Sequence, residues 1–151
     1  MTINPALADL QPLVGRWRIE LHNAAFLPDT DARVASSIEI HWIEDGSALC
    51  MKQGDSEHPP AAVWIIGRDD GESGYSVLYA DDRGVSRVYQ MSLDETSWRM
   101  WRDTPDFSQR FDAPLDLGTG AIRGRWQKST DQGATWEHDF NIDYIREQAP
   151  R

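Results

Sequence analysis

The sequence has little of several features that define common protein classes. Its single cysteine, Cys50, excludes an internal disulfide and fits a reducing compartment. It has 15 basic residues against 25 acidic ones, a net charge of −10, and no basic cluster of the kind that binds nucleic acid or an anionic membrane. No apolar run is long enough to cross a bilayer or to act as a signal peptide. We therefore expect a cytoplasmic protein whose partners include neither nucleic acid nor a membrane.

Motifs that carry catalytic or metal chemistry are also scarce. The nucleophile motif Gly-x-Ser-x-Gly is absent, and no catalytic Ser/His/Asp or Cys/His set can be identified from residue spacing. The four histidines and Cys50 lack metal-ligand spacing, so we expect no metal site.

Short alternating segments separated by turn residues dominate what remains. The 151 residues are enough for one domain, over residues 1–151, and seven tryptophans are available to fill a core or line a pocket. Many short strands with turn punctuation are typical of an all-β sandwich or barrel. We predict about ten strands: Val14–His22, Arg33–Ile43, Ser47–Gln53, Ala61–Gly67, Tyr75–Ala80, Val85–Leu93, Ser97–Asp103, Phe107–Ala113, Ala121–Lys128 and Trp136–Tyr144.

The connections between these segments are short, which favours antiparallel pairing of neighbours. Pairing of the last strand with the first, around Gly15–Leu21, would close the sheet into an up-and-down barrel. Asn4 before Pro5 starts a short helix whose apolar side we expect to plug one mouth. Because a barrel of eight strands already holds a small ligand, ten strands predict a cavity.

The last strand predicts one covered and one solvated face. Trp136, His138, Phe140, Ile142 and Tyr144 alternate with Glu137, Asp139, Asn141 and Asp143. His138 is therefore expected on the covered face. It is a core histidine bonded to one neighbour, a pocket group that hydrogen-bonds a ligand, or a haem ligand.

Strands six to eight carry the most suggestive polar residues. Three alternating faces run Arg87, Tyr89 and Met91, then Trp98, Met100 and Arg102, then Phe107, Gln109 and Phe111. If all three face inward, Tyr89, Arg102 and Gln109 converge among aromatic rings, as in a small-molecule pocket. An inward arginine favours an anionic or carbonyl-bearing ligand. The alternative is that the arginines pair with aspartates on the outer surface.

The hairpin before the last strand contains Ser129-Thr130-Asp131-Gln132-Gly133-Ala134-Thr135-Trp136. It matches the Asp-box pattern Ser-x-Asp-x-Gly-x-Thr-Trp, which in sialidases is a stabilising turn away from catalysis. Asp131 can bond the backbone that follows it and Gly133 can take a positive φ, so we predict a structural turn built on Asp131, Gly133 and Trp136.

The segment Leu13-Val14-Gly15-Arg16-Trp17 resembles the Gly-x-Trp strand of calycins, the superfamily of lipocalins, fatty-acid-binding proteins and nitrobindins. Arg146 near the C-terminus is similar to the basic residue that calycins lay across that tryptophan. The segments HWIEDGSAL, DDRGVSRVYQMSLD, WRMWRDTPDFSQRF and GRWQKSTDQGATWEHDF resemble an uncharacterised bacterial family of lipocalin-like domains. The resemblance implies a lipocalin-like barrel.

From these features we predict non-enzymatic binding of a small, largely apolar molecule in the barrel. The residues expected to contact it are Trp17, Tyr89, Met100, Arg102, Gln109, Trp126 and His138. One alternative is an acid–base enzyme of the isomerase, hydratase or decarboxylase type, which some calycins are, using Tyr89, Arg102 and His138. A second is a nitrobindin-like protein that binds haem through His138; otherwise no cofactor is expected. The sequence is compatible with a monomer or a homodimer.

Overall fold

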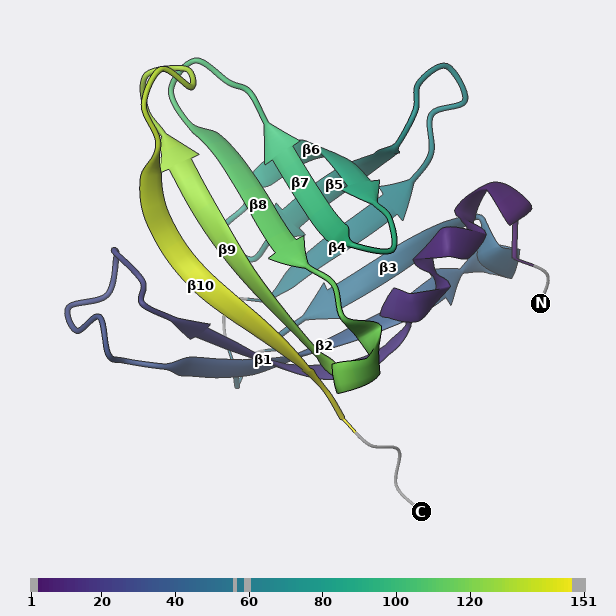
Figure 1. The fold of residues 1–151 in the computed structure, drawn as a ribbon, viewed down its shortest axis with the longest axis horizontal. Helices are drawn as coiled ribbons and strands as arrows, with labels where there is room; N and C mark the ends of the chain where they lie inside the picture. The colour runs from purple at the N-terminus through teal and green to yellow at the C-terminus, as the bar shows by residue number, and fades with distance from the viewer. Residues whose placement is uncertain (1–2, 56, 59–60, 148–151) are drawn as a thin grey trace.

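The computed structural model describes residues 3–55, 57–58 and 61–147. Ten antiparallel strands form one closed barrel in the order β1-β10-β9-β8-β7-β6-β5-β4-β3-β2 (Figure 1). The predicted fold class is confirmed, and each strand ends within two residues of its predicted bounds. The strands are β1 Gly15–His22, β2 Val34–Ile43, β3 Ala48–Gln53, β4 Ala62–Gly67, β5 Tyr75–Asp81, β6 Ser86–Leu93, β7 Ser97–Arg102, β8 Ser108–Pro114, β9 Ala121–Ser129 and β10 Glu137–Arg146.

The first and last strands close the barrel. β1 and β10 pair in antiparallel register from Trp17 opposite Arg146 to His22 opposite Asn141. Among the described strands, each therefore has a neighbour on both sides, so no backbone edge is left to pair with another chain.

The N-terminal helix η1, Pro5–Leu13, covers one end of the barrel (Figure 1). It is a 3-10 helix, which has three residues per turn, so residues three apart lie on one side. Leu7, Leu10 and Leu13 have that spacing and are all buried. The Asn4 side chain accepts a hydrogen bond from the Ala6 N–H at 2.9 Å, as expected of a capping residue. No helix in the described part of the chain is both long and apolar enough to cross a membrane.

Aromatic side chains fill the barrel near η1. The Trp98 ring lies 5.0 Å from that of Phe111 and 5.3 Å from that of Tyr144. Gly124 makes room for this packing, because a Cβ atom there would collide with the Phe111 ring. This end of the barrel is therefore solid core.

Strand β10 contains a β-bulge that the sequence pattern did not reveal. His138 pairs with Gln127 of β9 and Phe140 pairs with the adjacent Trp126, so Asp139 is an extra residue in the ladder. An extra residue reverses the alternation of side chains on its N-terminal side. Phe140 keeps its predicted inward direction, whereas Trp136 and His138 lie on the outer side and Asp139 turns inward.

Two contacts support this correction to the predicted faces. The Arg110 guanidinium lies 4.1 Å from the Trp136 ring centre, and Arg110 is exposed on the outer surface of β8. Gln127, opposite His138, accepts a hydrogen bond from the same Arg110 at 2.7 Å. The prediction that Trp136 and His138 share the covered face with Phe140 is therefore wrong.

The β9–β10 hairpin has the contacts expected of a structural turn. The Asp131 carboxylate accepts hydrogen bonds from the Thr135 N–H, the Thr135 hydroxyl and the Ser129 hydroxyl. These bonds, that from the Thr135 side chain foremost, lower the pKa of Asp131 to about 2. Gly133 has a φ of 85°, which a glycine adopts without strain.

Candidate functional site

A cavity of about 600 Å³ opens at the end of the barrel opposite η1. Such a volume is ordinary for a small-molecule site and corresponds to about twenty groups the size of water, at ~30 Å³ each. The five links at this end are the β1–β2, β3–β4, β5–β6, β7–β8 and β9–β10 connections. The barrel is thus filled at one end and hollow at the other.

Aromatic rings form the walls of the cavity. The inward positions of β4, β5 and β6 place Trp64 4.6 Å from Tyr79 and 5.6 Å from Tyr89, measured between ring centres. Across the barrel, Trp126 of β9 stacks with Phe140 of β10 at 6.2 Å. Edge-to-face and offset ring contacts of this kind are favourable, and the rings present a flat apolar surface to a ligand.

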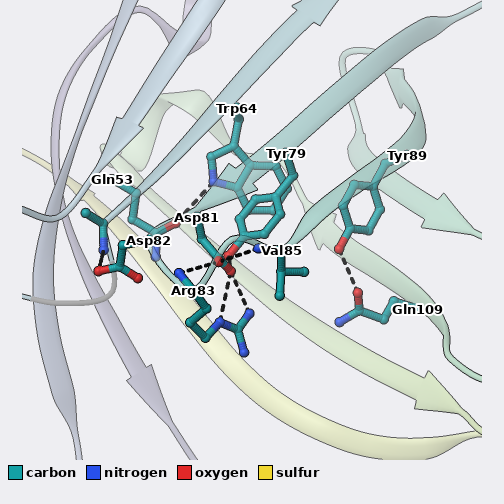
Figure 2. A network of polar contacts seen from close by, with 10 residues as sticks. Gln53, Trp64, Tyr79, Asp81, Asp82, Arg83, Val85, Tyr89 and Gln109 are labelled. Carbon is teal, nitrogen blue, oxygen red and sulfur yellow. Dashed lines mark hydrogen bonds and ion pairs between the residues drawn. The ribbon is translucent and has the colours of Figure 1, made fainter.

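Tyr89 and Gln109 form a buried polar pair in the wall of the cavity (Figure 2). The Tyr89 hydroxyl donates to the Gln109 side-chain oxygen at 2.6 Å, and the two residues are only 2% and 5% exposed. Burial raises the pKa of Tyr89, so the phenol stays protonated at neutral pH.

A second polar network lies at the β5–β6 hairpin, beside the mouth (Figure 2). Asp81 accepts hydrogen bonds from the Tyr79 hydroxyl at 2.7 Å and from Arg83 Nη2 at 2.6 Å. The Arg83 guanidinium, with the Tyr79 hydroxyl assisting, holds the pKa of Asp81 well below its usual range. Trp64 donates its indole N–H to Gln53 at 3.2 Å. These bonds fix the orientation of two rings in the wall.

The lining carries more positive than negative charge. Arg83, Arg87 and Lys128 are its basic members, and Asp139 is its acidic one. The Arg87 guanidinium lies 5.0 Å from the centre of the Phe107 ring. Because Arg83 is paired with Asp81, Arg87 and Lys128 against Asp139 leave an excess of one positive charge in the lining, which favours an anionic ligand.

The β1–β2 loop reaches over the mouth and is attached to the bulge. The Ala25 N–H donates to the Asp139 carbonyl at 2.8 Å, and His138 Nε2 lies 2.9 Å from the Asn23 carbonyl, to which it donates. Phe26 packs edge-to-face on Phe140 at 5.7 Å. The bulge therefore positions both the loop and the inward carboxylate.

The predicted site residues do not all meet in the cavity. Tyr89, Gln109 and Trp126 line it. Trp17 and Met100 are buried in the core at 2% and 1% exposure and are not in the lining. Arg102 lies opposite Gln109 on β7 and donates to the Thr104 hydroxyl at 3.3 Å, also outside the lining. His138 is on the outer side of the bulge.

Several lining residues were not among the predicted contacts. Trp64 and Tyr79 could have been found, since both fall on the inward phase of their strands once β3–β5 are aligned. Lys128 follows from Trp126 by the same alternation. Asp139 could not be found this way, because regular alternation assigns it to the outside.

Within residues 3–55, 57–58 and 61–147, no group of three or more His, Cys, Asp or Glu side chains is arranged to hold a metal ion. The chain matches no protein-family model. A comparison with curated proteins likewise finds no match.

Proposed function

We propose that the protein binds, without converting it, a small and largely apolar molecule that carries an anionic or carbonyl group. The observation that carries the proposal is the cavity of about 600 Å³, walled by aromatic rings and containing Arg87 and the Tyr89–Gln109 pair. Apolar walls favour ligand burial, whereas a few polar groups at fixed positions orient the ligand.

We also propose that the barrel is calycin-like. Support comes from the closed ten-strand topology, from η1 at one end, and from the Arg146 guanidinium, which lies 4.0 Å from the Trp17 ring centre. A cytoplasmic location, suggested by the single cysteine, belongs to the same proposal, as does the absence of nucleic-acid and membrane partners.

An acid–base enzyme is the second candidate, and Asp139 is the observation in its favour. Burial raises the pKa of this carboxyl inside the cavity, as is common for catalytic acids and bases. Haem binding through His138 has less support, because a histidine that donates to the Asn23 carbonyl on the outer side of β10 does not fit ligation from within the barrel.

Two matched fluorescent probes test the leading proposal. 8-Anilinonaphthalene-1-sulfonate is apolar and anionic, and N-phenyl-1-naphthylamine has a similar ring system without the sulfonate. We expect the protein to bind both probes and to prefer the anionic one. Arg87→Gln should weaken sulfonate binding by about tenfold, the effect of one lost hydrogen bond to a charged group, and leave the neutral probe within about twofold.

Arg99→Gln is the matched control, because Arg99 pairs with Asp112 at 3.2 Å on the exposed outer face of the barrel. Equal losses in the two variants would show that general electrostatics, and not the cavity, governs binding. If neither probe binds, the proposed function is wrong. Native mass spectrometry of the protein as purified adds a direct search for a retained molecule.

A further inference from the structure

Of the described residues that line the cavity, Asp139 is the acidic one, and its side chain has no partner among them. The residue is 6% exposed. Among the described residues, its carboxylate forms neither a hydrogen bond nor an ion pair, although its backbone carbonyl accepts from the Ala25 N–H. Burial raises the pKa of the carboxyl, and the charges of Lys128, His138 and Arg87 partly offset this effect.

In the described part of the chain, the Asp139 oxygens are not among the fully buried polar atoms that lack a hydrogen bond, so they keep contact with the solvent in the cavity. A carboxylate that accepts no hydrogen bond from the protein can accept one from a ligand that enters. The bulge that turns Asp139 inward also interrupts the β9–β10 ladder. A ligand that donates a hydrogen bond to the carboxylate would replace water there, and the bulge that turns Asp139 inward would then contribute to binding.

The surrounding charges limit what the donor can be. An ammonium group on the ligand would meet Asp139 but also face Arg87 and Lys128, which line the same cavity. A hydroxyl also donates to a carboxylate, and it carries no charge that Arg87 and Lys128 would repel. The two basic side chains then remain available to the acidic or carbonyl end of the ligand.

We propose that the ligand is an apolar acid that also bears a hydroxyl group, and that Asp139 recognises that hydroxyl. This inference rests on the proposed binding function and adds the class of ligand. Arg87 and Lys128 attract the acid, the aromatic walls contact the body, and Asp139 accepts the hydroxyl hydrogen. Because a site built to bond a hydroxyl discriminates strongly against analogues that lack it, Asp139 determines specificity.

The test compares 2-naphthoic acid with its 6-hydroxy and 7-hydroxy derivatives, by calorimetry at neutral pH. These compounds share an apolar body and a carboxylate and differ by one hydroxyl. In the unaltered protein, we expect at least one hydroxy acid to bind ten or more times tighter than the parent acid, as a hydrogen bond to a charged group implies. Asp139→Asn should reduce this preference to about threefold, and Asp139→Leu should abolish it.

Parent-acid affinity is the readout that separates this inference from the proposed function. It should stay the same or rise in Asp139→Leu, since that variant removes a buried charge. Asp112→Asn, at an exposed position on β8, is the control and should leave every affinity unchanged. Equal affinity for the parent and both hydroxy acids, or a hydroxyl preference that survives in Asp139→Leu, overturns the inference while the proposed function stands. Failure of all three acids to bind overturns the inference, and the proposed function falls with it only when neither fluorescent probe binds.

Discussion

Arg146 joins the two ends of the chain at the solid end of the barrel, and its removal should lower stability without affecting the cavity. Its guanidinium lies over the Trp17 ring at 4.0 Å. It also donates to the Val14 carbonyl at 2.8 Å and to the Pro12 carbonyl at 2.7 Å. One side chain thus connects β10, β1 and η1.

The expected loss in Arg146→Ala follows from these three contacts. The cation–π contact contributes about 0.5–1 kcal/mol at an exposed site. Each hydrogen bond from the charged guanidinium contributes about 1 kcal/mol, less than the usual value for a charged group because this one is partly solvated. The sum is about 2.5–3 kcal/mol of unfolding free energy. Arg146→Lys keeps the charge but not the planar fork, so about half of that loss is expected.

Urea unfolding monitored by tryptophan fluorescence measures the loss, with Arg16→Ala as the matched control. Arg16 pairs with Glu39 at 3.8 Å on the exposed face of β1, and such a pair contributes about 0.5 kcal/mol or less. Probe binding should be the same in all three variants. A loss in Arg146→Ala no larger than that in Arg16→Ala would refute the reasoning that Arg146 fastens the closed end.

Three further predictions concern other contacts. Gly124→Ala should lower the unfolding free energy by about 1–3 kcal/mol, because the new methyl group displaces the Phe111 ring, and denaturant unfolding measures this. Tyr89→Phe leaves the buried Gln109 oxygen without its donor and should cost about 1–2 kcal/mol in the same assay, whereas no change would mean that water replaces the phenol. Asp131→Ala should lower the melting temperature at neutral pH and leave probe affinity unchanged. Because the folded-state pKa of Asp131 is lowered to about 2, its contribution is complete above about pH 4 and is lost as the pH falls through 2, so melting curves of variant and parent should converge there.

The barrel was predictable because its signals are local. Alternating segments such as Val34–Ile43 and turn residues such as Gly133 fix where strands begin and end, and short links fix which strands are neighbours. Closure of the barrel was predictable because the first and last strands each need a neighbouring strand to pair with. The three buried leucines of η1 are spaced by three residues, which is the repeat of a 3-10 helix.

The candidate site was less predictable, because its chemistry depends on two things: how far along the barrel axis each side chain lies, and whether it faces inward or outward. Alternation puts Met100, Gln109 and Trp17 inside the barrel, but it does not say which of them lie in the filled half and which in the hollow half. The inward direction of Asp139 depends on one unpaired residue in β10, and no turn residue or glycine marks its position.

The bulge at Asp139 determines which side chains in the first part of β10 face the interior. A related barrel in which the counterpart of Asp139 paired regularly with β9 would turn the counterpart of His138 inward and that of Asp139 outward, without a substitution at either position. The pairing of the final strand with β9 therefore decides which of its side chains reach the cavity, and the identity of the residues alone does not.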